Sequence, residues 1–176
     1  SIPKDCNLQL SNSSIVRYSQ FFEISPEIKV FCNRGTSGID GSTSTAIGAA
    51  MTTKEPTFFI TGDVSFFYDS NALWNQYIPS NFRIILINND GGGIFKIIPG
   101  PKNSEVLEYF ETPHGLEASA LCAMHDLEYE CAETEAELID SLQSFYKESL
   151  VPKLLEIKTP SEINDLVLKD YLKKIK

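Results

Sequence analysis

The chain has 176 residues, of which 42% are hydrophobic and 11% aromatic, and this composition is sufficient for one globular domain with a core. No stretch of about 18 consecutive apolar residues occurs, so the sequence predicts no membrane-spanning helix. The 24 acidic and 15 basic side chains give a formal net charge of −9, and no Lys/Arg stripe offsets it, which argues against a nucleic-acid partner.

Apolar runs alternate with helical patterns along the whole chain. In chain order we predict a helix over 11–22, a buried strand over 28–32, a helix over 41–51, a strand over 57–61, a helix over 70–77, a strand over 82–88, a helix over 117–125, a strand over 127–131, a helix over 134–146 and a strand over 151–157. Thr134 and Glu137 have the spacing of a capping box, and Pro152 favours an edge strand or a strand start.

This alternation predicts an α/β fold, a three-layer, doubly wound, mainly parallel sheet with helices on both faces. We expect one domain over residues 1–160 and a charged C-terminal tail over 161–176 that is helical at its end. The chain starts without Met and without the features of a signal or transit peptide. We therefore interpret it as a fragment of a larger protein or as a processed start.

Four cysteines are spread along the chain without a CxxC pair. They are Cys6, Cys32, Cys122 and Cys131. This spacing supports neither a thiolate metal site nor a disulfide framework. We therefore expect reduced thiols and a cytoplasmic protein.

Gly-rich polar segments follow three of the predicted strands, at 33–41, 62–65 and 88–93. In open parallel sheets, ligands bind outside the carboxyl ends of the strands. Because all three segments begin where a strand ends, we expect them to lie at one edge of the sheet and to form a binding site there.

Two of these segments carry hard oxygen ligands of the kind that Mg²⁺ prefers. Asp63 ends one predicted strand and Asn89 ends the next, and Gly91 has no Cβ to prevent its carbonyl from turning inward. The N–H groups of Val64 and Ser65 open the following helix and are suited to hold a phosphate. One carboxylate holds Mg²⁺ weakly, so a diphosphate that completes the ligand shell is the physical expectation.

The three Gly-rich segments, in this order and spacing, resemble the cofactor motifs of thiamine diphosphate (ThDP)-dependent enzymes. The general pattern has Gly-Asp-Gly where this chain has Gly62-Asp63-Val64, and an apolar third residue is typical of one branch. From about residue 12 to about residue 98, the chain resembles the C-terminal diphosphate-binding domain of 2-succinyl-5-enolpyruvyl-6-hydroxy-3-cyclohexene-1-carboxylate synthases. These are ThDP-dependent transferases of menaquinone biosynthesis.

The resemblance implies a role for individual residues. It assigns Mg²⁺ or Mn²⁺ to the side chains of Asp63 and Asn89 and to the carbonyl of Gly91. It implies cofactor contacts for Ser37, Gly38, Ile39, Gly62, Asp63, Val64, Ser65, Asn89, Gly91 and Gly92. It implies substrate contacts for Ser13, Arg17, Arg34, Ile94, Phe95 and Ile98.

The resemblance also implies a reaction and a partner. Such an enzyme decarboxylates 2-oxoglutarate and adds the succinyl unit to isochorismate, and Arg17 and Arg34 suit the carboxylates of these substrates. The glutamate that activates ThDP lies on a pyrimidine-binding domain, usually of a partner subunit, and nothing in this chain matches it. We therefore expect a homodimer or homotetramer of the full-length enzyme, and an isolated domain without activity.

Two other functions fit parts of the pattern. Another ThDP-dependent carboligase or decarboxylase, such as an acetolactate synthase relative, would share the cofactor motifs but would have less need of Arg17 and Arg34. A non-catalytic, flavodoxin-like phosphate-binding module would need no Mg²⁺ and would tolerate the loss of Asp63.

Ordinary structural roles compete with the functional ones. Asp63 also fits a helix N-cap, and residues 89–91 also fit a turn. Arg17 fits an exposed helix position. His114 and His125 match no partner pattern, so we expect the first in a loop and the second at a helix end.

Overall fold

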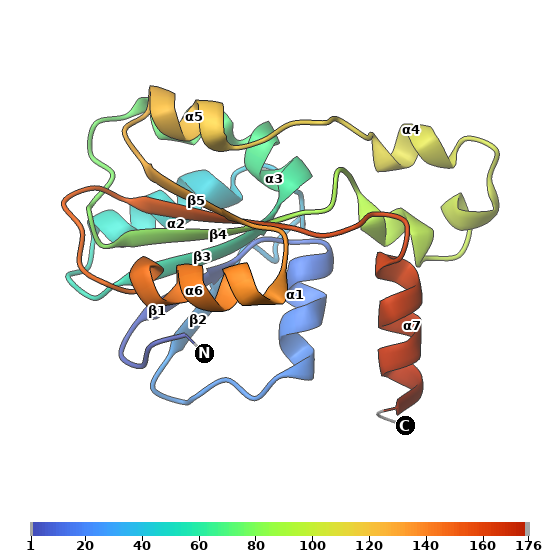
Figure 1. Cartoon of the computed structure of the whole chain (residues 1–176), viewed down its shortest axis with the longest axis horizontal. Helices are drawn as coiled ribbons and strands as arrows, with labels where there is room; N and C mark the ends of the chain where they lie inside the picture. Colours follow the sequence, from blue (N-terminus) through green and yellow to red (C-terminus); the bar gives the residue numbers. More distant parts are fainter. Residues whose placement is uncertain (1, 175–176) are drawn as a thin grey trace.

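The structure, a computed structural model, describes residues 2–174. Within them, six strands form one sheet in the order β2-β1-β3-β4-β6-β5, and every neighbouring pair is parallel (Figure 1). The strands are β1 Asn7–Leu10, β2 Lys29–Cys32, β3 Thr57–Gly62, β4 Phe82–Asn88, β5 Glu128–Ala132 and β6 Lys153–Lys158. The predicted α/β class is confirmed, and the described sheet is parallel throughout.

Helices connect the strands. The α-helices are α1 Ser14–Tyr18, α2 Ser42–Met51, α3 Asp63–Tyr68, α4 Leu107–Glu111, α5 Ser119–Met124, α6 Glu135–Phe145 and α7 Asn164–Lys174. The short 3₁₀ helices are η1 Ser19–Phe21, η2 Ser70–Trp74, η3 Gly93–Lys96 and η4 Pro101–Asn103. Helix α7 lies in the segment predicted as a charged tail, whose last two residues lie outside the described ones.

The first predicted helix was wrong in extent, and the strand before it was not predicted. The helix over 11–22 is a short α1 that starts at Ser14 and continues into η1, and β1 precedes it. Strand β1 has the sequence Asn-Leu-Gln-Leu, with no β-branched residue, so it has little local strand signal. All four of its residues are buried between β2 and β3, so tertiary pairing determines its conformation.

The helix predicted over 70–77 was also wrong. The segment after β3 is α3, which begins directly at Asp63, and the predicted region holds only the 3₁₀ turn η2. Asp69 separates the two, and its carboxylate accepts the backbone N–H of Ser44 at 2.7 Å and the Ser44 hydroxyl at 2.8 Å. The buried Asp69 side chain therefore ties this turn to the first turn of α2.

One positional prediction was wrong, and another is confirmed in one of its two alternatives. Strand β2 was predicted to be buried, but it is an edge strand and three of its four residues are exposed. Of the two alternatives predicted from Pro152, the strand start is confirmed, because β6 begins at Lys153, and the edge strand is wrong, because β6 lies between β4 and β5. A proline directly before the first strand residue removes no ladder hydrogen bond, which is why the position is tolerated.

Helices cover both faces of the sheet (Figure 1). Helices α2, α3 and α5 lie on one face, where Phe59, Ile84 and Leu86 belong to the core. Helices α1 and α6 lie on the other face, where Phe58 and Ile85 belong to a second core. Because side chains alternate along a strand, neighbouring residues of β3 and β4 enter opposite cores, and this gives the predicted three layers.

The strand order creates a binding position at the carboxyl edge. The chain leaves β1 toward β2 on one side and returns to pair β3 on the other side of β1. Loops that follow neighbouring strands diverge at such a switch point and leave a crevice. The segments after β1 and β3 border this crevice, and they contain Ser13 and Asp63.

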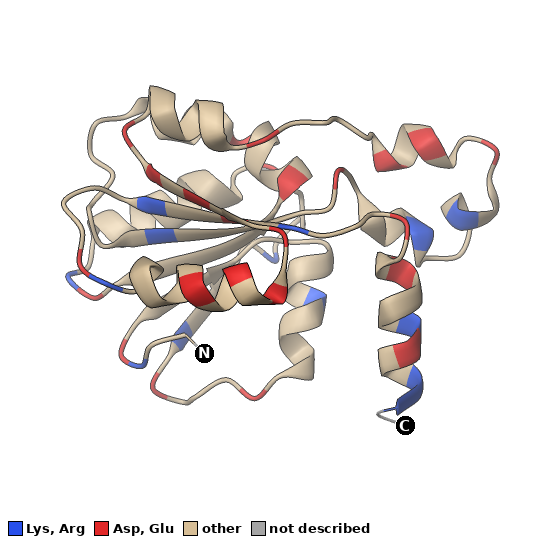
Figure 2. Cartoon of the chain, in the orientation of Figure 1, with Lys and Arg blue, Asp and Glu red and all other residues tan. Residues whose placement is uncertain are grey.

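Charge on the described surface is uneven but mainly acidic. Figure 2 shows acidic residues on α6 and α4, and residues of both signs on α7. No helix among residues 2–174 combines the length and the apolar character needed to cross a membrane.

The capping box predicted at α6 is present. Thr134 Oγ1 accepts the N–H of Glu137 at 3.3 Å, and Glu137 Oε2 accepts the N–H of Thr134 at 3.0 Å. We expect Thr134→Ala to lower the free energy of unfolding by about 1 kcal/mol, measured by urea denaturation. Glu137→Gln keeps an acceptor for the Thr134 N–H and should cost less, so equal losses in both variants would contradict the capping role of Thr134.

Candidate functional site at the carboxyl edge of the sheet

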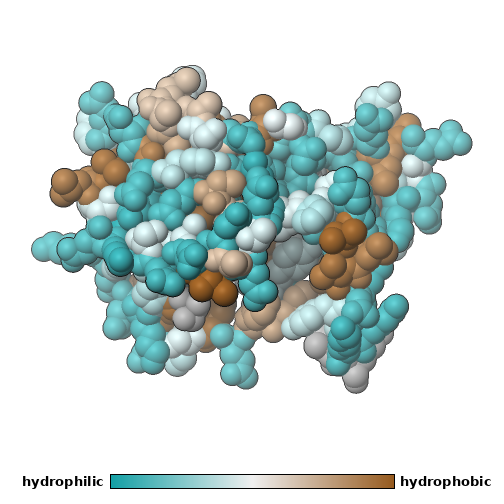
Figure 3. All heavy atoms as spheres, in the orientation of Figure 1, coloured by the Kyte–Doolittle hydropathy of each residue, from teal (hydrophilic) through white to brown (hydrophobic). Residues whose placement is uncertain are grey.

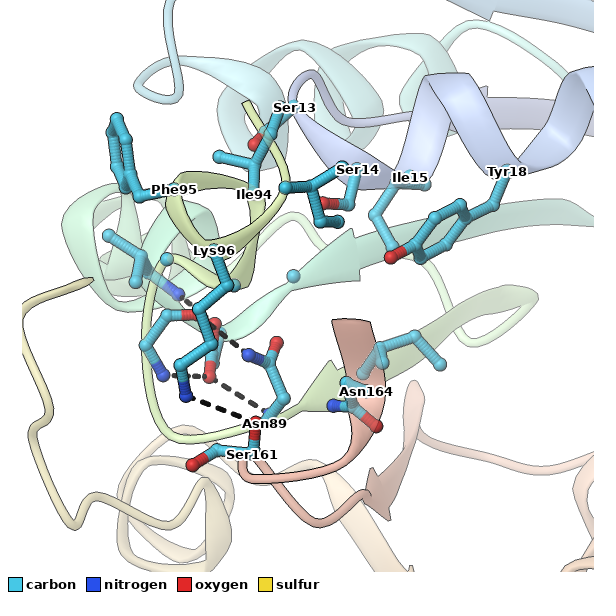
Figure 4. Close-up of a pocket in the computed structure, with 18 of the residues that line it drawn as sticks. Ser13, Ser14, Ile15, Tyr18, Asn89, Ile94, Phe95, Lys96, Ser161 and Asn164 are labelled. Atoms are coloured by element: carbon cyan, nitrogen blue, oxygen red, sulfur yellow. Dashed lines mark hydrogen bonds between the residues drawn. The ribbon is translucent and has the colours of Figure 1, made fainter. Parts of the chain in front are cut away.

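A cavity of about 590 Å³ opens at the carboxyl edge of the sheet. Its walls come from the segments that follow β1, β3, β4 and β6, and α7 closes one side. In Figure 4, Ile94 lies beside Ser13, and Asn89 projects from the end of β4. The cavity therefore occupies the place where ligands bind in open parallel sheets.

Asp63, the first residue of α3, holds the loop after β4 with its carboxylate. Oδ2 accepts the N–H groups of Asn89 at 3.0 Å and Gly91 at 2.8 Å, and Oδ1 accepts the N–H of Val64 at 2.7 Å. Asp63 is 2% exposed, and this burial raises the pKa of its carboxyl, while the N–H donors, led by Gly91, oppose the rise. Because each carboxylate oxygen has two acceptor positions, Oδ1 keeps one for another partner.

The other two predicted metal-binding groups lie next to each other. Asn89 Nδ2 donates to the Gly91 carbonyl at 3.0 Å. Two oxygens in contact repel each other unless a cation lies between them, so the amide nitrogen faces the carbonyl here. A cation would need the amide oxygen at this place, which requires rotation of the same side chain and no movement of the backbone.

These three predicted metal-binding groups fit a cation that is also coordinated by another molecule. Asp63, Asn89 and Gly91 together supply one carboxylate, one amide and one carbonyl oxygen. Residues 2–174 contain no cluster of three or more His, Cys, Asp or Glu side chains that could hold a metal ion. Mg²⁺ prefers six oxygen ligands and keeps water or phosphate among them, so the site suits Mg²⁺ with a phosphate-bearing ligand.

The loop after β2 reaches the same edge through Asn12. Asn12 is 2% exposed, its Nδ2 donates to the Gly38 carbonyl at 2.7 Å, and its Oδ1 accepts from Arg34 Nη1 at 2.7 Å. The hydroxyl of Ser65 donates to the carbonyl of Ile39. The three Gly-rich segments therefore meet at one edge of the sheet, as the sequence predicts.

The predicted site residues fall into two groups. The residues that line the cavity are Ser13, Ile39, Gly62, Asp63, Val64, Ser65, Asn89, Gly91, Gly92, Ile94 and Phe95. Those outside its lining are Arg17, Arg34, Ser37, Gly38 and Ile98. The structure therefore gathers the predicted metal and diphosphate groups, whereas both arginines are exposed and lie outside the lining of the cavity.

The outer part of the cavity is largely apolar. Ile15 and Tyr18 of α1 lie side by side along it (Figure 4), and Ile94 faces it from η3. Phe21 packs against Tyr171 of α7 with ring centroids 5.6 Å apart. Figure 3 shows hydrophobic residues gathered on the surface beside the start of α7. A reacting group deep in this cavity would therefore be shielded from water on several sides.

Two residues in or beside the cavity lining, Lys96 and His114, were not predicted from any sequence motif. Lys96 Nζ pairs with Glu111 Oε1 at 2.9 Å and donates to the Ser161 carbonyl at 3.1 Å, which ties η3 to α4 and to the segment before α7. His114 Nε2 lies 3.4 Å from Asp63 Oδ2. In each case the partners are far apart in the sequence, so no local motif marks them.

Comparison with known proteins gives a family. The chain is 59% identical over 171 residues to 2-succinyl-5-enolpyruvyl-6-hydroxy-3-cyclohexene-1-carboxylate synthase of Christiangramia forsetii, a match that covers 97% of the chain. It is 55% identical over 176 residues to the synthase of the same name from Flavobacterium johnsoniae, which covers 99%. The chain belongs to this synthase family. It spans about a third of these relatives, 30% and 32% of their lengths.

A solved structure agrees on the fold of the chain. The Rhodococcus jostii ThDP-dependent 4-hydroxybenzoylformate decarboxylase superposes with a TM-score of 0.66 over 90% of the chain and 30% of its own chain. The two are 22% identical, so this likeness shows the fold alone. No family model matches the chain. The family and the fold class inferred from the sequence motifs are thus confirmed.

Proposed function

We propose that this chain is the ThDP- and Mg²⁺-binding domain of a synthase that decarboxylates 2-oxoglutarate and adds the succinyl unit to isochorismate. One observation carries the proposal: in a chain 59% identical to a named synthase, the buried Asp63 carboxylate is bonded to the loop that bears Asn89 and Gly91. ThDP, when bound, supplies the electron sink that both the loss of CO₂ and the new carbon–carbon bond require.

The chain's own residues then bind and orient the cofactor. Asp63, Asn89 and Gly91 would hold the cation, and the cation would hold the diphosphate. The backbone around Gly62, Val64 and Ser65 lines the same part of the cavity and would contact the diphosphate, with Ser37, Gly38, Ile39 and Gly92 as further cofactor contacts. The side chain of Ile39 would support the bent form of the cofactor.

The apolar wall would bind the reacting end of the substrate. Ser13, Ile94 and Phe95 line the cavity and would contact the substrate, as would Ile98, which lies outside the lining. An apolar, water-poor surrounding disfavours a separated carboxylate charge and so favours loss of CO₂.

The two arginines, which lie outside the cavity lining, would recognise the substrate carboxylates. The guanidinium group of Arg34 donates a hydrogen bond to Asn12, and Asn12 lines the cavity. Arg17 lies on α1, whose residues Ile15 and Tyr18 face the cavity. A guanidinium group binds a carboxylate through two parallel hydrogen bonds, which suits both positions to dicarboxylate substrates.

The rest of the active site would come from chain that is not part of this fragment. The activating glutamate and the pyrimidine-binding domain would be supplied by the remaining two thirds of the enzyme, from a partner subunit in a homodimer or homotetramer in the cytoplasm. The fragment alone is then inactive.

Calorimetric titration of the 176-residue chain with ThDP tests the proposal. We expect ThDP to bind in the presence of Mg²⁺ or Mn²⁺ and not in the presence of a chelator, because one carboxylate and two neutral oxygens hold a diphosphate only through a cation. ThDP binding with the same affinity in the presence and absence of the chelator would favour the flavodoxin-like alternative. Turnover of 2-oxoglutarate and isochorismate should appear only in the full-length enzyme, and turnover by the fragment alone would contradict the composite site.

A further inference from the structure

A histidine of intermediate exposure places its buried Nε2 beside a predicted metal ligand. His114 Nε2 lies 3.4 Å from Asp63 Oδ2, and the His114 side chain is 12% exposed. Among the described residues, Nε2 has no hydrogen-bond partner. Buried polar atoms are usually satisfied, so an unpartnered nitrogen directed at this carboxylate calls for an explanation.

The position of the proton on His114 follows from its other nitrogen. Nδ1 accepts the backbone N–H of Leu116 at 2.9 Å, so in the neutral ring the proton is on Nε2. The ring of Phe67 packs edge-on against the imidazole, with centroids 5.2 Å apart and an interplanar angle of 71°. These contacts fix the ring with Nε2, which carries the proton of the neutral form, beside the Asp63 carboxylate.

The segment that carries His114 is held by the residues on either side of Asn89. The carboxylate of Asp90 accepts the backbone N–H of His114 at 3.0 Å, and the side-chain amide of Asn88 donates to the Leu116 carbonyl at 2.9 Å. The loop that bears two predicted metal ligands therefore also sets the position of the histidine that faces the third.

A buried carboxylate makes this arrangement rigid. Glu156 of β6 is fully buried, and its Oε1 accepts from Asn88 Nδ2 at 2.6 Å. Its Oε2 accepts the N–H of Ala118 at 3.1 Å and the hydroxyl of Tyr129 at 2.6 Å. The segment after His114 is thus fastened to the centre of the sheet, and the imidazole has little freedom to move away from Asp63.

We propose that His114 is a positioning residue of the cation site: its Nε2–H, 3.4 Å from Oδ2 of Asp63, stabilises the carboxylate electrostatically in the orientation that leaves Oδ1 for the cation. Oδ2 already accepts two N–H groups, which fill both of its acceptor positions, so it has no position for a metal. Oδ1 accepts only one N–H, and Asp63 is one of the residues that line the cavity. This inference rests on the proposed function, because it concerns the cation that ThDP would need.

Two substitutions at His114 distinguish its role beside Asp63 from its role in the turn that ends at Leu116. His114→Gln keeps a nitrogen donor at the same number of bonds from Cα as Nε2 and loses the acceptor for Leu116. His114→Asn keeps an acceptor in the place of Nδ1 and lacks a donor that can reach Asp63. With saturating ThDP, we expect the Mg²⁺ dissociation constant to rise about tenfold in the Asn variant and to stay within about threefold of the wild type in the Gln variant.

The outcomes distinguish the inference from the proposed function. No Mg²⁺-dependent ThDP binding by the wild-type chain would overturn both. Wild-type binding with equal Mg²⁺ affinity in the Asn variant would overturn only the role of His114. A long-range ¹H–¹⁵N spectrum gives a readout without the cation, with His125 as the other histidine of the sequence. We expect the proton of His114 on Nε2, and a proton on Nδ1 alone would overturn the inference.

Discussion

Replacing Asp63 with Asn should abolish cation-dependent binding of ThDP to the chain. The substitution keeps the size of the side chain but removes the only carboxylate among the three predicted metal-binding groups, the others being neutral oxygens of Asn89 and Gly91. An amide would also present an NH₂ group to backbone N–H donors that now point at a carboxylate oxygen. We expect a loss of Mg²⁺ affinity of about a hundredfold or more, measured by calorimetry at saturating ThDP.

An exposed aspartate provides the matched control. Asp140 lies on α6, on the other side of the sheet, and is exposed, so Asp140→Asn removes the same charge from the chain without touching the cavity. Its Mg²⁺ affinity should remain that of the wild type. Equal affinities in the Asp63 and Asp140 variants would remove Asp63 from the metal site and with it the main support for the proposed function.

Local motifs made the centre of the site predictable. The segments 33–41, 62–65 and 88–93 each begin at the end of a strongly apolar strand, and parallel strands put their carboxyl ends at one edge. Asp63 could be identified because its partner groups also stand directly after strands. Fold class and the meeting of the three loops therefore followed from patterns within short windows.

Contacts between distant segments were not predictable in the same way. His114 reaches Asp63 only because Asp90, Asn88 and Glu156 hold its segment across the end of the sheet. Strand β1 has no β-branched residue and so little local strand signal, and its pairing with two neighbours decides its conformation. Tertiary interactions override weak local propensity in both cases, and they are invisible to periodicity.

A tertiary contact also explains the glycine at position 91, in the glycine run after β4. Replacing this glycine is the second substitution from which we expect a large effect. Gly91 has a φ of +138°, and a Cβ at this position would lie 2.6 Å from the Glu111 carbonyl oxygen. The next N–H, that of Gly92, donates to this same carbonyl at 2.7 Å. A side chain at position 91 must therefore displace either the loop or the end of α4, and the predicted metal-binding carbonyl of Gly91 moves with the loop.

Gly91→Ala should consequently lower both stability and metal affinity. We expect a loss of about 2 to 3 kcal/mol in the free energy of unfolding, from backbone strain together with the close contact, and a Mg²⁺ affinity at least tenfold weaker. Gly100→Ala is the matched control: it also has a positive φ, of +102°, but its Cβ would meet nothing within 4 Å and it lies outside the cavity lining. This control should lose stability from strain alone and keep its Mg²⁺ affinity. If Gly91→Ala bound Mg²⁺ as tightly as Gly100→Ala, the Gly91 carbonyl would not be a metal ligand, because its displacement would have had no effect on the site.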